Sequence, residues 1–408
     1  MYRDEVFIAG GQPTVTYVDR QEMHVERGFA RALATPNQIV SVAGPTKTGK
    51  TVLCKKVLGN REYVWIDAGE VSSSATLWEK VQSELNIPYE RASQEEKSGG
   101  IEAGINLPLF SAGGSRLFAR SASEAFRVDG MGASLETMLN QKIVLVIDDF
   151  HYLDSAVRTE IVRNIKGSVF NGLKVVLLSV AHRVFDAISA EAELTGRFIS
   201  VQLPEWSGEE LIQIPQRGFA ALKVTPPTTL IARLVDECQA NPFLMQKFCW
   251  EICFDNDIEK APLFGAQEIP SHYDLEGMFS RLAQDAGLPI YQKLVTGPQA
   301  RKERLKRPLK AGEEADIYEA TLLALAQTGP KATVSYEELR GKLGSLLVEM
   351  MPQKHEITSA LKHLSNISVK SGTESAIDWD EDRREINLAD PYLRFYLRWQ
   401  VRDRGDNT

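Results

Sequence analysis

The stretch Gly44-Pro45-Thr46-Lys47-Thr48-Gly49-Lys50-Thr51 decides the fold class of this chain. It fits the pattern G-x-x-x-x-G-K-[ST]. Residues 38–43 before it form a short apolar run typical of a buried strand, and residues 52–58 after it have a helical pattern. A glycine-rich loop between a strand and a helix is the context in which this pattern predicts a phosphate-binding loop. The sequence therefore predicts an α/β protein with a parallel-sheet P-loop NTPase core.

The residue types in this loop suit a triphosphate. Gly44 and Gly49 have no Cβ, so backbone N–H groups can turn inward around the α- and β-phosphates. Lys50 places a positive charge on the β- and γ-phosphates, and the Thr51 hydroxyl can ligate Mg²⁺. The helix that begins at the loop adds the positive end of its dipole. We assign the whole loop and the residue after it to the nucleotide: Gly44, Pro45, Thr46, Lys47, Thr48, Gly49, Lys50, Thr51 and Val52.

A second strand supplies carboxylates. Residues 143–147 form a continuous apolar run, as expected for a central parallel strand, and end in Asp148-Asp149. Ligands of open α/β sheets bind at the carboxyl ends of the strands. We therefore expect Asp148 to hold Mg²⁺ together with Thr51, and Asp149 to orient or deprotonate the attacking water. The guanine-reading pattern N-K-x-D is absent from the sequence, which favours ATP over GTP.

Composition bounds the class of protein. The chain has 408 residues, of which 43% are hydrophobic and 25% charged, and these values are typical of a soluble protein with two or three domains. A formal net charge of -8 argues against extensive coating of nucleic acid. The sequence has neither a run long enough to span a bilayer nor a C-x-x-C pair among its four cysteines. We expect a cytoplasmic protein that has no membrane partner.

Further strands are predicted at residues 63–67, 173–180 and 198–203, with helices at 75–85, 134–140 and 155–166. Between them, residues 98–132 are rich in glycine and serine and poor in charge, and part of the segment alternates like a β-hairpin. We interpret it as an insertion into the ATPase core. A surface for a partner or for self-association and a disordered loop are equally good interpretations.

Several segments resemble the AAA+ and STAND classes of P-loop ATPases. An aromatic and aliphatic segment ending in Arg20 precedes the first helix, and Asn241-Pro242 begins another helix further along. In those classes the first segment lines the adenine pocket, and the proline of a G-x-P motif sits against the adenine. The resemblance implies that Arg20 and Pro242 contact the nucleotide. Arg20 as a structural cap of the sheet is an equally good interpretation.

Two arginines resemble catalytic positions of the same classes. Arg183 follows the strand at 173–180, where the sensor 1 residue of AAA+ proteins touches the γ-phosphate or the attacking water; Ser179 and His182 are the alternatives. Gly196-Arg197-Phe198 precedes an edge strand, and in AAA+ proteins such an arginine can reach the nucleotide of a neighbouring subunit. Arg197 pairing with the surface of its own domain is as good an interpretation.

The resemblance implies three domains: an ATPase core at residues 1–204, a helical lid at 205–300 and a winged helix at 311–408. The last comprises three helical patterns, a polar hairpin and an Asp-Pro-x-x-Arg-Phe ending that begins at Asp390 and resembles the archaeal-type branch of STAND ATPases. Acidic residues at 378–382 argue against DNA phosphates on the hairpin, whereas the basic run 301–310 leaves DNA binding open.

The sequence therefore favours an ATP-driven molecular switch or assembly factor, of the kind that serves defence or stress systems, with ATP and Mg²⁺ as ligands. A homo-oligomer or a protein partner is implied. The alternative is a DNA-acting regulator or loader of the initiator or transposition-helper type.

Overall fold

The computed structural model describes residues 1–20, 23–87, 130–180, 197–299, 303–329, 331–348, 351–370 and 376–401. The chain divides into two compact units, which are described separately. The first unit comprises Met1–Glu26, Gly44–Cys54 and Leu203–Thr408, and the second comprises Arg27–Ala43 and Lys55–Gln202. Two helices, α2 (Val25–Ala34) and α3 (Lys50–Leu58), each contain a boundary between the units. The predicted insertion lies largely outside the described residues, although its last three residues, 130–132, begin a helix that runs to residue 141.

The second unit is built on a five-stranded parallel sheet with the order β2-β3-β4-β1-β5. The strands are β1 (Ile39–Ala43), β2 (Tyr63–Asp67), β3 (Val144–Asp148), β4 (Val175–Ser179) and β5 (Phe198–Gln202). Because every pairing is parallel, the carboxyl ends of the strands lie along one edge of the sheet. The α/β fold with a parallel core is confirmed.

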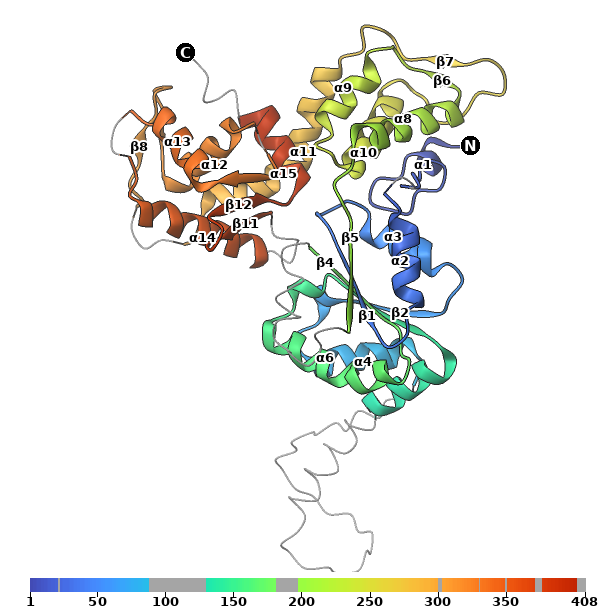
Figure 1. Cartoon of the computed structure of the whole chain (residues 1–408). Helices are drawn as coiled ribbons and strands as arrows, with labels where there is room; N and C mark the ends of the chain where they lie inside the picture. The colour runs from blue at the N-terminus through green and yellow to red at the C-terminus, as the bar shows by residue number, and fades with distance from the viewer. Residues whose placement is uncertain are drawn as a thin grey trace, which may run out of the picture. The chain divides into compact units, whose positions relative to one another are not determined.

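The apolar runs become strands because both faces of the central sheet are buried. All five residues of β1 and all five of β4 are buried. On one face, alternate strand residues pack into a core with α4 (Ser74–Glu84), α6 (Ser155–Phe170) and the helix at residues 130–141. Figure 1 shows α4 and α6 beside the sheet. The strand residues of this core are Ile39, Val64, Ile66, Leu145, Ile147, Val175 and Leu177.

The first unit contains a helical region between residues 208 and 296, drawn in green to orange in Figure 1. Its elements are α8 (Gly208–Leu222), β6 (Val224–Thr225), α9 (Leu230–Glu237), α10 (Pro242–Asp255), β7 (Gln267–Glu268) and α11 (Leu275–Thr296). Ser207 followed by two glutamates is a helix-start pattern in the sequence, and α8 begins there: the Ser207 side chain accepts from the Glu210 N–H in a reciprocal capping box. Pro242 occupies the first turn of α10, as predicted.

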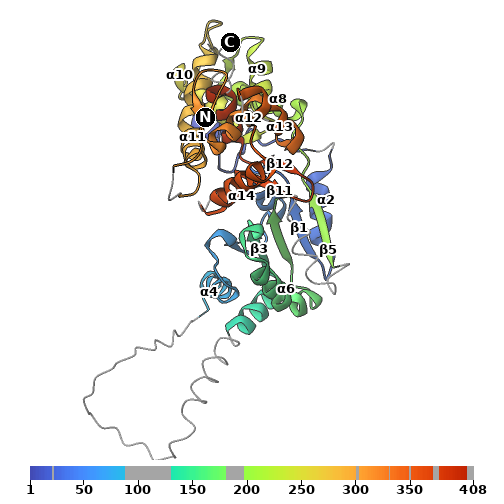
Figure 2. The ribbon, with the colours of Figure 1, turned by 90° about the vertical axis from the view of Figure 1, so that its left-hand side faces the viewer.

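The C-terminal part of the first unit contains α12 (Ile317–Gln327), α13 (Tyr336–Leu346) and α14 (Lys354–Lys370). A three-stranded antiparallel sheet in the order β10-β12-β11 accompanies them: β10 (Thr333–Ser335), β11 (Ile377–Asp380) and β12 (Glu385–Leu388). α14 lies beside the β11–β12 hairpin in both views of the ribbon (Figures 1 and 2). The chain continues into α15 (Pro391–Tyr396) and a π-helical turn, Leu397–Val401.

Three features differ from the expectations. The opening of the chain, with Gly10-Gly11-Gln12-Pro13, was expected to be a loop, but Arg3–Val6 form a short helix, α1. Part of the basic run forms β8 (Arg307–Pro308), which pairs with β9 (Glu314–Ala315). Asp378, expected near the hairpin tip, is a buried strand residue whose carboxylate accepts from Ser365.

The packing of α11 against α15 depends on Gly287. A Cβ at this position would lie 2.2 Å from the Tyr396 Cβ and 2.9 Å from the Tyr392 carbonyl oxygen, both of which are fixed by the α15 backbone. We expect Gly287→Ala to destabilise the protein by about 1–3 kcal/mol, because the two helices must separate.

Gly341→Ala in α13 is the matched control, because a Cβ there meets no atom of the described residues within 4 Å. That variant should be stabilised by about 0.5–1 kcal/mol, since alanine has the higher helix propensity. Urea unfolding followed by circular dichroism measures both changes. Equal effects of the two substitutions would contradict the assigned helix contact.

Candidate functional site

The loop Gly44–Thr51 is shaped by its two glycines. Gly49 has φ +94°, a left-handed conformation that suits glycine, and α3 begins at the next residue, Lys50. Gly44 packs so closely on Leu203 that a Cβ would lie 2.8 Å from the leucine Cβ. Both glycines are therefore required by the backbone, as the sequence pattern predicts.

The Lys50 side chain lies inside the loop. Its ammonium group donates to the carbonyl oxygens of Gly44 at 3.1 Å and Pro45 at 2.9 Å, and the residue is only 6% exposed. The Thr48 hydroxyl also donates to the Pro45 carbonyl, at 2.7 Å. These bonds close the loop on itself and keep a buried positive charge at its centre.

Two side chains that precede helices of the first unit hold the outside of the loop. The Asn241 amide donates to the Thr46 carbonyl at 3.3 Å, and the Trp206 indole donates to the Thr48 carbonyl at 3.0 Å. In a trans peptide the N–H points opposite to the carbonyl of the same peptide unit. The N–H groups of Lys47 and Gly49 are therefore directed away from these anchors, as a phosphate cradle requires.

The turn before Asn241 has a strained backbone and is held in place by polar contacts. Gln239 and Ala240 both have left-handed backbones, with φ of 56° and 54°. Just before them, the buried Glu237 carboxylate accepts from Arg398 at 2.8 Å and from the Trp399 indole at 3.0 Å. Arg398 and Trp399 thus hold the turn from which the Asn241 side chain contacts the loop.

The apex of the loop carries an ion pair with the C-terminal part. Lys47, whose φ is +58°, places its ammonium group 2.8 Å from a carboxylate oxygen of Asp390 and over the ring of Tyr392, 4.5 Å from its centroid. Asp390 is buried and also accepts from the Leu393 N–H, so it caps α15 while it pairs with the loop.

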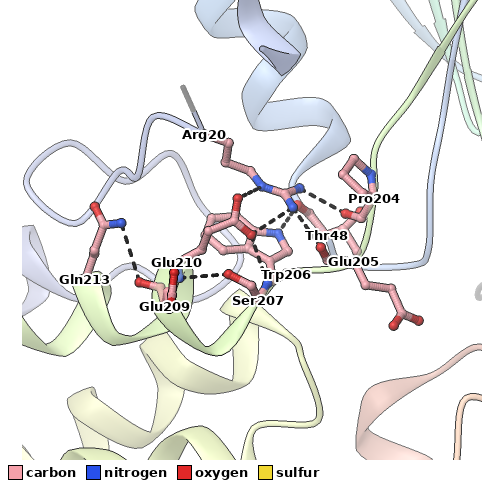
Figure 3. Close-up of polar contacts among 9 residues, drawn as sticks. All are labelled: Arg20, Thr48, Pro204, Glu205, Trp206, Ser207, Glu209, Glu210 and Gln213. Atoms are coloured by element: carbon pink, nitrogen blue, oxygen red, sulfur yellow. Dashed lines mark hydrogen bonds and ion pairs between the residues drawn. The ribbon is translucent and has the colours of Figure 1, made fainter. Parts of the chain in front are cut away.

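Arg20 lies beside the loop but is engaged by the protein. Its guanidinium donates twice to Glu210, at 2.8 and 2.9 Å, and to the carbonyls of Pro204 and Glu205, and it stacks over Trp206 (Figure 3). Burial by itself raises the pKa of Glu210, but the hydrogen bonds from Arg20 and Ser207 outweigh it and hold the pKa below its ordinary value.

The acidic site of the second unit lies at the carboxyl edge of its sheet. Asp148 is the last residue of β3 and is in register with Asp67, the last residue of β2. Asp149 follows in a left-handed conformation, φ +52°, with its N–H donating to the Asp148 carboxylate at 2.9 Å. Ala43, the residue before the phosphate loop, ends β1 at the same edge.

The remaining predicted residues fall in different places. Arg197 precedes the edge strand β5, and its guanidinium lies 5.3 Å from the centroid of the exposed Phe170 ring in its own unit. Arg183 lies outside the described residues, and so does His182. Ser179, the other alternative, is buried at the end of β4.

Four side chains around the loop were not assigned to the site from the sequence: Trp206, Glu210, Asn241 and Asp390. Asn241 and Asp390 share a signal, since each is an Asx residue that caps a helix beginning with proline. That signal predicts where a helix starts but not in which direction the helix runs. It therefore could not predict that both side chains contact the phosphate loop.

The loop fits a nucleotide polyphosphate. It offers a buried ammonium group, inward N–H groups and the N-terminus of α3. The buried Thr46 hydroxyl has no hydrogen-bond partner among the residues that the structure describes. Among the described residues, no group of three or more His, Cys, Asp or Glu side chains could hold a metal ion, and no helix is long and apolar enough to cross a membrane.

Comparison with known proteins agrees with this fold. Residues 34–181 match the family model described as an AAA domain. A Walker-type ATPase of Pyrococcus abyssi is similar in structure, with TM-score 0.53, 15% identity, and coverage of 94% of this chain and 96% of the other. The fold is that of an AAA+ P-loop NTPase.

The ORC2 protein of Aeropyrum pernix, in ADPNP and ADP complexes, is also similar, with TM-score 0.53 and 13% identity over 98% of this chain and 97% of the other. At these identities the two structures support the AAA+ fold alone. No curated protein sequence matches the chain.

The Arg20–Glu210 pair predicts a pH dependence of stability. Because the folded-state pKa of Glu210 is lowered, its contribution to stability is complete above the ordinary glutamate pKa of about 4.3 and is lost as the pH falls through the folded-state value. Glu210→Gln should therefore be less stable than the wild type at pH 7, by about 1.5–3 kcal/mol, and the difference should shrink below pH 4.

Chemical unfolding at pH 7 and at pH 3.5 measures the difference. Glu209→Gln is the control, since Glu209 is exposed on the same turn. A difference for Glu210→Gln that stays constant with pH would contradict the charged pair.

Proposed function

We propose that this chain is an ATP-binding and ATP-hydrolysing molecular switch of the STAND type, which couples nucleotide state to self-association or to activation of a protein partner. One observation carries the proposal. The phosphate loop is anchored both by Asn241 at the start of α10 and by Asp390 at the start of α15. A ligand that changes the loop therefore acts on the helical lid and on the C-terminal part together.

In this proposal Lys50 and the N–H groups of Lys47 and Gly49 bind the phosphates, while Thr51 and Asp148 hold Mg²⁺. The metal would neutralise charge that develops on the transferred phosphoryl group. Asp149 orients the attacking water and accepts its proton. Its left-handed backbone at the end of β3 supports the assignment, because such conformations recur at active sites.

We assign Arg20 and Pro242 to the part of the site that receives the adenine base. Pro242 follows Asn241, whose side chain touches the loop, and this neighbourhood supports a contact with adenine. Arg20 is held by Glu210, so we propose that it shapes the segment beside the nucleotide and keeps α8 in place.

We propose a winged helix for the C-terminal part and favour a protein-binding role over DNA binding. The order helix, strand, two helices and a hairpin supports the winged-helix assignment. Within the basic run, Arg307 is buried and pairs with Glu356 at 2.8 Å, and Arg304 pairs with Asp316 at 2.8 Å. Engaged guanidinium groups contribute little to phosphate binding. ATP turnover that rises on addition of duplex DNA would favour the regulator or loader instead.

Removal of the loop ammonium group tests the nucleotide site. Lys50→Ala should abolish ATP binding, because the charge at the centre of the loop disappears, and Lys56→Ala on the same helix should bind as the wild type does. Titration with a fluorescent ATP analogue measures both affinities. Unchanged ATP affinity of folded Lys50→Ala protein would refute the phosphate-loop assignment.

Arg183 and Arg197 are proposed to act on the γ-phosphate, the second from a neighbouring subunit. Arg197→Ala should then lower turnover by roughly 10³-fold while ATP affinity changes little. Mixing it with Asp149→Asn protein should restore activity, because each subunit supplies the group that the other lacks. Steady-state ATPase assays across protein concentrations provide the measurement. A specific activity that is independent of dilution, with no rescue on mixing, would place Arg197 on the surface of its own domain.

A further inference from the structure

The contact between Lys47 and Asp390 joins a loop residue to a carboxylate 343 positions away in the chain, within the same unit. Asp390 is well shielded, with 7% of its side chain exposed, whereas 26% of the Lys47 side chain is exposed. The carboxylate is therefore fixed and the lysine is the more mobile partner.

The position of Lys47 makes this pair sensitive to a bound nucleotide. Lys47 stands within the phosphate loop, three residues before Lys50, and its own N–H is directed into the cradle. A lysine ammonium group on a flexible four-carbon stem can turn from one anion to another. Phosphate oxygens in the loop and the Asp390 carboxylate are thus rival partners for the same ammonium group.

The charges around Asp390 favour this competition. Lys47 is its paired cation, and the buried guanidinium of Arg394 on the same short helix acts electrostatically on both Asp390 and Glu205. Asp390 therefore keeps a cationic neighbour when Lys47 turns away. ATP carries one more negative charge than ADP at its phosphate end, so it attracts Lys47 more strongly and repels the fixed carboxylate more strongly.

We propose that Asp390 is a specificity-determining residue of the nucleotide site, which lowers the affinity for ATP relative to ADP by competing with the γ-phosphate for Lys47. The proposal rests on the proposed nucleotide-binding function. It gives the C-terminal part of the chain a role in distinguishing ATP from ADP. With ADP the ion pair persists and α15 stays attached to the loop. With ATP the pair opens and α15 is released from the loop.

Asp390→Asn tests the proposal without removing the helix cap, since asparagine caps a helix as well as aspartate does. The ratio of the ATP to the ADP association constant should rise by about five- to tenfold, because Lys47 is freed for the γ-phosphate. Isothermal titration of the full-length protein with ATP and with ADP, both with Mg²⁺, gives the ratio. Lys47→Gln combined with Asp390→Asn completes a double-mutant cycle.

In the Lys47→Gln background, Asp390→Asn should also change the ratio of the ATP to the ADP association constant. This fold-change should be at least three times smaller than the one in the wild-type background. Asp316→Asn is the matched control: Asp316 also caps a helix, α12, and pairs with an arginine at 2.8 Å, but its partner Arg304 is not part of the loop. That substitution should leave the ratio within twofold of the wild type.

Three results would overturn the proposal: an unchanged ratio in Asp390→Asn, an equal shift with and without Lys47, or an equal shift in Asp316→Asn. Wild-type protein that binds neither nucleotide would instead refute the proposed function itself. Wild-type binding with an unchanged ratio in Asp390→Asn refutes the specificity role of Asp390 alone.

Discussion

The outward hold on the carbonyl groups of the phosphate loop is the constraint on which the site depends. Asn241 and Trp206 each donate to a loop carbonyl oxygen from outside the loop. Since the carbonyl and the N–H of a trans peptide point in opposite directions, fixing one fixes the other. The anion-binding face of the loop is therefore set by side chains that never touch the ligand.

The sheet could be predicted closely because its signals are local. Each core strand is a short apolar run that ends at a polar or small residue, and burial on both faces demands such a run. Helix starts were equally readable, since Ser207 and Asn241 cap their helices through their own side chains. The position of the paired carboxylates followed from the strand end, because Asp148 closes β3.

The surroundings of the loop could not be predicted in the same way. Thr46 and Asn241 are 195 positions apart, and Arg20 and Glu210 are 190 apart. No local pattern encodes which distant carboxylate an arginine meets, so the sequence left Arg20 open between a nucleotide contact and a structural cap. In the structure its guanidinium donates to Glu210 and to two backbone carbonyls. The basic run left DNA binding open for the same reason, whereas Arg307 is buried against Glu356.

The anchors around the loop differ in how they can respond to a ligand. Hydrogen bonds from Asn241 and Trp206 to carbonyl groups join neutral partners and each contribute roughly 0.5–1.5 kcal/mol, so they preorganise the loop and change little when charge arrives. The Lys47–Asp390 contact joins two full charges, and its energy therefore depends directly on any third charge nearby. A loop held in this way can keep its backbone shape while one side chain changes partner. The nucleotide signal would then pass to the C-terminal part through electrostatics rather than through deformation of the loop.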